Sequence, residues 1–315
     1  MSGRPKIYAY ADVGRFGLGH GMLAWARCVV WCAQSGATLL PPRWLRARIG
    51  PLLRNERDKR FYFKLFRNAT RISAARRIAL LGTRQKIAAD VAVDMPQTEM
   101  PDGAVILFTN VNSGNEARYF HQVIGQQDIV RTALLAMTRP RYRPAAIPYR
   151  HIAIHVRGGD FGMPADVGKL TQGATNQRLP VSWFGEMLAG FRSRLGHDAP
   201  AIIYSDCSDE EIAPLLAMPN VARSRHRESV TDMLAMSGAD VQISSGSGFS
   251  RWGAYLGSVP RICFPGQRHI RIFGDQTGPV DLEPEAMAAT ELSDDFVSLC
   301  NNRLISPMNQ KDNQP

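Results

Sequence analysis

Short apolar runs and amphipathic stretches alternate along most of the 315-residue chain. In the first half, apolar runs at 6–10, 37–40 and 104–109 predict buried strands, and periodic stretches at 22–35 and 129–137 predict helices. Buried strands that alternate with helices pair side by side in a parallel sheet, joined by right-handed crossovers. The alternation therefore predicts an α/β fold built on parallel sheets.

The pattern starts again after a stretch at 139–148 that contains three prolines and three arginines and is the best candidate for a domain boundary. Beyond it, strands are expected at 151–156, 201–204, 239–243 and 261–264, and helices at 181–195, 208–218, 230–237 and 249–256. Ser208 and Glu211 form the pattern of a capping box. We expect two Rossmann-like domains, residues 1–145 and 146–305, and a frayed tail at 306–315.

Composition is typical of a globular protein, with 44% hydrophobic and 21% charged residues. No apolar run reaches the roughly 18 residues that span a bilayer, and no leader pattern is present, so a cytoplasmic protein is expected. The five cysteines are an odd number, which disfavours a disulfide framework. Cys28 and Cys32 are expected to be reduced core thiols on one face of a helix.

The net charge of +10 has its whole surplus in residues 43–86, which hold fourteen Lys and Arg against two acidic residues. One interpretation is a solvated helical insertion, and the other is a surface for polyanions such as acidic lipid headgroups or a phosphorylated carrier. Aromatic residues interleave with the charges at 61–66, as they do in helices that lie on membranes. Nucleic acid is a disfavoured partner, because stacking motifs and a metal-binding carboxylate cluster are missing from the sequence.

A glycine-rich loop, Gly14 to Gly21, joins the first strand to the first helix and suggests a phosphate at the helix N-terminus. It does not fit the dinucleotide fingerprint, because Met22 stands at the third glycine position and no acidic residue follows the second strand. The P-loop and zinc-site patterns are also missing from the sequence. A nicotinamide-dependent oxidoreductase, a P-loop NTPase and a zinc enzyme are therefore poorly supported.

Three segments follow predicted strands of the second half, namely His155–Phe161, Tyr204–Asp206 and Ser244–Ser250. Arg157 emerges from a buried strand into two glycines and can bind a phosphate in a bidentate manner. The Ser/Gly loop at 244–250 opens a helix, and its amides and hydroxyls can cradle a phosphate. Each segment alone can be a structural ion pair or a plain turn. Together, at adjacent strand ends, they favour a nucleotide-diphosphate site.

The stretch His155-Val156-Arg157-Gly158-Gly159-Asp160-Phe161 resembles the H-x-R-x-G-D-[YF] motif of the GDP-fucose-dependent fucosyltransferases. Residues 243–256 resemble the Ser-rich motif of the α-1,2 enzymes, and 204–206 resemble their strand that ends in Ser-Asp. The loop at 14–17 is similar to that of the protein O-fucosyltransferases, and 17–22 to that of the α-1,2 enzymes. The resemblance spans about residues 7–265.

This resemblance implies the GT-B arrangement, in which two Rossmann-like domains face each other across a cleft and the second holds the donor. The implied reaction is inverting, metal-independent transfer of fucose from GDP-fucose to a glycan, lipid-linked or polysaccharide hydroxyl. Arg157 would stabilise the departing GDP, with Asp160, Asp166 or Asp12 as the general base, or with none. The implied donor-binding residues are Gly14, Phe16, Gly17, His20, His155, Arg157, Gly159, Ser205, Asp206, Asp232, Ser245, Gly246, Ser247, Gly248, Phe249 and Ser250. No cofactor is implied.

Two positions depart from the family pattern. The family commonly has a second arginine where this chain has Gly158, and its loop asparagine is replaced by Leu18 or His20, depending on register. These changes leave the identity of the sugar open. The alternative function is a catalytically silent nucleotide-sugar fold that binds a glycan or an anionic partner, and turnover of GDP-fucose separates the two. The basic segment suggests a peripheral contact with the inner membrane face.

Overall fold

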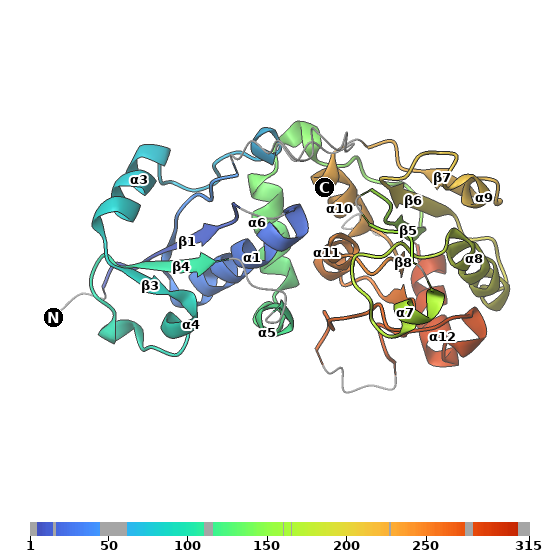
Figure 1. The fold of residues 1–315 in the computed structure, drawn as a ribbon. Coiled ribbons are helices and arrows are strands. Elements are labelled where there is room, and N and C mark those ends of the chain that lie inside the picture. The colour runs from blue at the N-terminus through green and yellow to red at the C-terminus, as the bar shows by residue number, and fades with distance from the viewer. Residues whose placement is uncertain are drawn as a thin grey trace. The chain divides into compact units, whose positions relative to one another are not determined.

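The computed structural model describes residues 5–14, 17–44, 62–109, 116–159, 161–164, 166–226, 228–274 and 280–307. This described chain divides into two compact units, one that runs to Arg141 and one that begins at Tyr142, and each has its own sheet (Figure 1). Every strand pairing within the two sheets is parallel. The expected α/β class with a Rossmann-like parallel sheet in each half is therefore confirmed.

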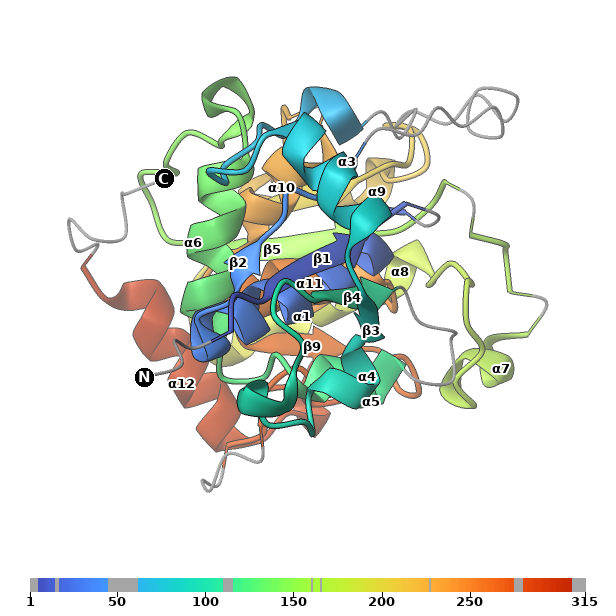
Figure 2. The same cartoon turned by 90° about the vertical axis from the view of Figure 1, so that its left-hand side faces the viewer.

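The first unit contains a four-stranded sheet in the order β2-β1-β4-β3, which Figure 2 shows in front view. Its longest helix, α1, packs on β1 and β4 and against α6. The elements are β1 (Tyr8–Asp12), α1 (Leu18–Ser35), β2 (Thr38–Leu39), α3 (Ala74–Thr83), β3 (Lys86–Ala88), α4 (Ala89–Ala92), β4 (Val105–Thr109), α5 (Glu116–His121) and α6 (Gln127–Met137), with 3₁₀ turns at Tyr62–Lys64, Gln97–Glu99 and Pro140–Tyr142.

The second unit contains a five-stranded sheet in the order β7-β6-β5-β8-β9. In Figure 1, α10 and α11 lie on one face of this sheet, and α8 and α12 lie on the other. The elements are β5 (Ile152–Val156), α7 (Val167–Thr171), α8 (Val181–Leu195), β6 (Ala201–Ser205), α9 (Ala213–Leu216), β7 (Val221–Arg223), α10 (Ser229–Met236), β8 (Val241–Ser244), α11 (Gly248–Gly257), β9 (Arg261–Cys263) and α12 (Asp294–Ile305), with a 3₁₀ turn at Ala289–Glu291.

Burial of the central strand organises the second unit. All five residues of β5 are buried, as expected for a parallel strand that is covered on both faces. Ile152 and Ile154 lie in one hydrophobic cluster with Phe184 and Phe191 of α8 and Phe296 of α12. The carboxyl end of β5 therefore leaves a rigid core, which gives the residues that follow a fixed starting point.

Two predicted helices need correction. Helix α1 begins at Leu18, four residues earlier than predicted, with Gly17 as its N-cap. Gly21 lies inside this helix, where a Cβ would be only 3.2 Å from the carbonyl oxygen of Val13, the residue after β1. A glycine suits this close approach. The helix predicted at 208–218 shortens to α9, because Pro214 can occupy only the first turn. The capping pair still forms just before it.

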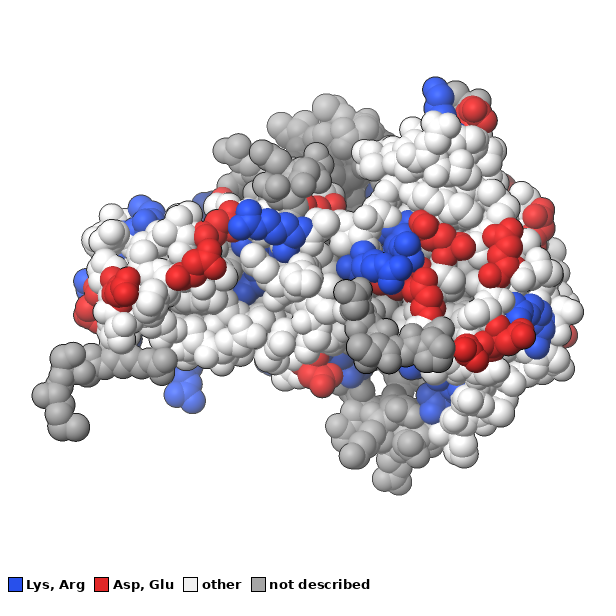
Figure 3. Space-filling view, turned by 90° about the horizontal axis from the view of Figure 1, so that it is seen from below, with Lys and Arg blue, Asp and Glu red and all other residues white. Residues whose placement is uncertain are grey.

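All five cysteines are free and buried, which confirms the prediction of reduced core thiols for Cys28 and Cys32. Among the described helices, none has the length and hydropathy required to cross a bilayer. Figure 3 shows one face of the molecule, on which basic and acidic side chains are interspersed. The described residues 62–86 differ from this pattern, because they contain seven Lys and Arg and no acidic residue.

Candidate nucleotide-sugar site

The sheet order brings the three predicted strand ends together. β5 is hydrogen-bonded to β6 on one side and to β8 on the other, with Val156 opposite Ser205 and His155 opposite Ser244. The chain builds outward from β5 through β6 to β7, and then returns to place β8 on the opposite side of β5. Open parallel sheets bind ligands at such a reversal, just beyond the carboxyl ends of the strands. Arg157, Asp206 and the Ser/Gly loop all follow these adjacent ends.

Arg157 is held by an acidic partner at this edge. Its guanidinium forms an ion pair with Asp206, whose other carboxylate oxygen accepts a 2.7 Å hydrogen bond from the amide of Gly158. The guanidinium also lies 5.2 Å from the centre of the Phe161 ring. The side chains of Arg157 and Asp206 are 26% and 25% exposed, so the pair is partly accessible. Asp206 therefore orders the turn that presents Arg157.

The two glycines after Arg157 are required by close packing. A Cβ at residue 158 would overlap the Sγ of Cys207, and a Cβ at residue 159 would overlap the carboxylate of Asp206. Gly159 also has a φ of +43°, a value that side-chain-bearing residues rarely adopt. Cys207 thus occupies the space that a side chain at residue 158 would need.

The serines of the loop hydrogen-bond mainly to one another. Ser247 caps α11 by accepting from the amide of Ser250 at 3.2 Å, and the Ser250 hydroxyl donates to the carbonyl of Ser245 at 2.9 Å. Ser250 is fully buried, so its hydroxyl orders the loop instead of facing a ligand. The first turn of α11 has no acidic residue, and the space around Gly248 is open. Its N-terminal amides are therefore placed to attract an anion.

His155 links the central strand to this loop. Its Nδ1 lies 2.7 Å from the Ser245 hydroxyl, while its backbone carbonyl accepts from the amide of Ser245 at 3.1 Å. Its ring also packs 5.5 Å from that of Phe249. Burial and the positive charge of Arg157 lower the pKa of His155 to about 3, so the ring is neutral at physiological pH. A neutral histidine fixes the loop without adding charge to the site.

The other expected donor-binding residues of the second unit have local partners. Ser205 accepts from the amide of Cys207 at 3.0 Å and so shapes the turn after β6. Asp232, in the first turn of α10, accepts from the Ser224 hydroxyl at 2.7 Å and pairs with His226 at 3.3 Å. This pair at the start of α10 was missed from the sequence, although Ser224 and His226 directly follow β7.

Two of the candidate bases, Asp166 and Asp12, have local backbone partners. Asp166 caps the short helix α7 by accepting from the amide of Gly168 at 2.9 Å, and it is exposed. Asp12 ends β1 and accepts from the amide of Gly14 at 3.2 Å. Asp160 and Phe16 lie outside the described residues. Gly14, Gly17 and His20 belong to the first unit, around the start of α1.

A buried brace follows β9 and was missed from the sequence. Gln267 is 3% exposed and donates to the carbonyls of Leu170 at 2.7 Å and Ala174 at 3.1 Å. Its side chain fills the space beside Gly246, so that a Cβ there would overlap it. Gln267 therefore joins the segment around α7 to the Ser/Gly loop. Only its place in the fold identifies it, since its partners are distant in sequence.

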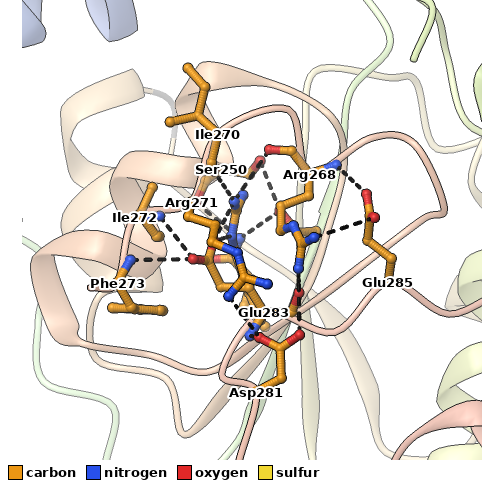
Figure 4. Close-up of polar contacts among 12 residues, drawn as sticks. Ser250, Arg268, Ile270, Arg271, Ile272, Phe273, Asp281, Glu283 and Glu285 are labelled. Atoms are coloured by element: carbon orange, nitrogen blue, oxygen red, sulfur yellow. Dashed lines mark hydrogen bonds and ion pairs between the residues drawn. The ribbon is translucent and has the colours of Figure 1, made fainter. Parts of the chain in front are cut away.

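The chain around this brace is held by a buried ion pair, of which Figure 4 labels the acidic member, Glu283. Arg261 of β9 and Glu283 are 1% and 2% exposed and lie 2.6 Å apart. The second oxygen of Glu283 accepts from the amides of Ile272 at 2.8 Å and Phe273 at 3.2 Å (Figure 4). A buried pair with satisfied hydrogen bonds fixes a loop in one conformation. This network fixes the chain that follows Gln267.

Neither a protein-family model nor a curated protein matches the chain in sequence. Solved structures do resemble it. The fucosyltransferase NodZ from Bradyrhizobium is 13% identical over 84% of this chain and 97% of that one, with a TM-score of 0.44. POFUT1 in complex with GDP-fucose is 12% identical over 86% of this chain and 99% of that one, with a TM-score of 0.40. What the present site can do follows from its own residues.

Proposed function

We propose that the chain is a glycosyltransferase that moves fucose from GDP-fucose to a hydroxyl of a glycan or glycoconjugate. The observation that carries this proposal is the position of Arg157 at the reversal point of the sheet, after strand β5, whose neighbour β8 leads into α11. A cation and a set of helix amides at one sheet edge suit a diphosphate. The resemblance of residues 155–161 to the fucosyltransferase motif supports GDP-fucose as the donor.

In the proposed reaction, an acceptor oxygen attacks C1 of fucose on the face opposite the nucleotide. The bond from C1 to the β-phosphate oxygen breaks, and GDP leaves with the electron pair, so the configuration at C1 inverts. The sugar is oxocarbenium-like in the transition state, and the growing negative charge lies on the diphosphate. Arg157 and the α11 amides act on that charge, which makes the proposed reaction independent of a metal.

The fate of the acceptor proton distinguishes versions of this mechanism. Asp160, Asp166 and Asp12 remain the carboxylate candidates for a general base. One carboxylate oxygen of Asp166, Oδ1, already caps α7, so a proton would go to its Oδ2. A mechanism without a carboxylate base, in which the proton passes to solvent or to the departing diphosphate, stays open beside these three.

The proposed acceptor is presented on an anionic surface, such as a lipid-linked or polysaccharide acceptor at the cytoplasmic face of a membrane. Residues 62–86 support this, with seven basic residues and no acidic one. Exposed side chains on or beside α3, among them Arg71, Arg76 and Ile78, combine charge with apolar area. Anionic bilayers attract such surfaces. Arg54, Arg57, Lys59 and Arg60, which belong to the same basic segment, lie outside the described residues.

The proposal is tested by a melting-temperature panel with GDP-fucose, GDP-mannose, UDP-glucose, ADP-glucose and a CMP-sugar. A ligand that binds only the native state raises the melting temperature. We expect both GDP-sugars to raise it, and GDP-fucose alone to be turned over. A shift only with UDP-, ADP- or CMP-sugars would overturn the donor assignment. Binding of GDP-fucose without release of GDP, with any acceptor or with water, would favour the silent binding protein.

A further inference from the structure

The turn that carries Arg157 is held from outside by a second arginine, Arg178. Its Nε donates to the carbonyl of Phe161 at 3.0 Å and its Nη2 to the carbonyl of Gly159 at 3.4 Å. The backbone amide of Arg178 donates to the carbonyl of Gly162 at 2.8 Å. One residue thus engages three carbonyls of the segment that follows β5. These bonds fix the path of the chain directly after Arg157.

Arg178 is in turn held by the segment after β6. Its Nη1 lies 2.6 Å from Oε1 of Glu211. The other oxygen of Glu211 accepts from the amide of Ser208 at 2.7 Å, and the amide of Glu211 faces the Ser208 hydroxyl at 3.3 Å. The Ser208 amide and Arg178 lower the pKa of Glu211, so this carboxylate is charged at neutral pH. The capping pair predicted from the sequence therefore anchors Arg178.

The two turns joined in this way are the ones that carry Arg157 and Asp206. Asp206 links them on one side, through the Arg157 guanidinium and the amide of Gly158. Arg178 and Glu211 link them on the other. Arg178 is close to the motif, because its Cζ would lie 3.6 Å from a Cβ at residue 158. The charge of Arg178 is balanced by Glu211. The carboxylate that pairs with Arg157, that of Asp206, also accepts from the Gly158 amide and so shapes the turn.

We propose that Arg178 is a positioning residue for Arg157. It holds the turn at 158–161 so that the Arg157 guanidinium stays at the diphosphate position, and it does not bind the phosphates itself. This inference rests on the proposed function, since it assigns Arg178 to the same nucleotide site. A purely structural role for Arg178 would lower the stability of the fold without a specific effect on binding of the diphosphate.

A double-mutant cycle tests the inference, with GDP and guanosine titrated calorimetrically into the wild type, Arg157→Ala, Arg178→Ala and the double variant. Residues that act through one another are non-additive, so Arg178→Ala should weaken GDP binding about tenfold alone and less than about twofold when Arg157 is absent. Guanosine affinity should change less than about twofold throughout, because it lacks the diphosphate. Arg178→Lys, which keeps the charge and some donors, should fall between the wild type and Arg178→Ala.

Arg194 supplies a matched control in the same unit. It also donates to two carbonyls, those of Ala289 and Leu292, and pairs with Asp294, but it lies at the end of α8. Arg194→Ala should lower the melting temperature and leave GDP affinity unchanged. Glu211→Gln keeps the size of its side chain and should weaken GDP binding in the same direction as Arg178→Ala. If Arg178→Ala does not fold, Glu211→Gln still tests the inference.

The possible outcomes distinguish the positioning role of Arg178 from the proposed function. Additive losses in the cycle would make Arg178 a direct phosphate ligand and overturn the positioning role. Unchanged GDP affinity in folded Arg178 and Glu211 variants would also overturn it and would leave the proposed function standing. A wild type that binds neither GDP nor GDP-fucose would overturn the proposed function and the inference with it.

Discussion

Because residue 158 has no side chain, the turn after β5 can pack against Cys207, which follows β6. We expect Gly158→Ala to destabilise the second unit, because its Cβ would overlap the Sγ of Cys207. Overpacking a filled interior costs about 1–3 kcal/mol in the free energy of unfolding. Adding Cys207→Ala removes the sulfur and should restore most of the stability in urea unfolding. A double variant no more stable than Gly158→Ala would show that the overlap is not the cause.

Residue identity also explains which parts of the site could be predicted. Arg157, Asp206 and the Ser/Gly loop were found because each directly follows an apolar strand, and strand neighbours share an edge. Arg178 and Gln267 were missed because the backbone carbonyls to which their side chains donate lie 17 or more residues away and carry no sequence signal. The expected role of the Ser250 hydroxyl changed because burial turns it inward.

At the scale of elements, the sequence predicts best where local signals agree with packing. Helix α8 was predicted over its full length because its amphipathic pattern ends at Gly196, which adopts the left-handed conformation. Strands β3 and β7 were missed because they are short edge strands without a buried residue, so no apolar run marks them. The helix at 208–218 was overextended because its capping signal at Ser208 is real, while Pro214 delays the helix.

Helix α3 and its flanks give a testable prediction at this scale. Arg71 and Arg76 are exposed in a segment without acidic residues, and each charge near an anionic bilayer contributes about 1 kcal/mol. Replacing both with serine should weaken binding to phosphatidylserine vesicles roughly 30-fold at low salt. Arg118→Ser with Arg141→Ser removes two exposed charges outside residues 43–86 as a control. If the wild type does not bind such vesicles at low salt, the basic segment at 62–86 is a solvated face.

For the whole molecule, two buried histidines predict how stability depends on pH. Burial lowers the pKa of His151 to about 4 and, together with the charge of Arg157, that of His155 to about 3. The unfolded chain protonates both near pH 6.5, so between pH 6.5 and about 4 it binds more protons than the native state. The stabilisation is complete above pH 6.5 and decreases as the pH falls, by up to about 1.4 kcal/mol per pH unit for each histidine.

Urea unfolding of the wild type and His151→Gln between pH 4 and 7 checks this expectation. His151 lies outside the nucleotide site, at the start of the second sheet, and its backbone amide donates to Asp240. The slope of unfolding free energy against pH should be smaller in the variant over this range. Equal slopes in the two proteins would mean that His151 is protonated in the native state as readily as in the unfolded one.

The central claim is that Arg157 drives departure of GDP from GDP-fucose without a metal. The most direct test is the initial rate of GDP release from GDP-fucose in EDTA, for the wild type and for folded Arg157→Ala. We predict release by the wild type and a loss of about 100- to 1,000-fold in the variant, because one preorganised contact to the developing charge is removed. Near-normal release by Arg157→Ala, or wild-type release only after a divalent cation is added, would contradict the account.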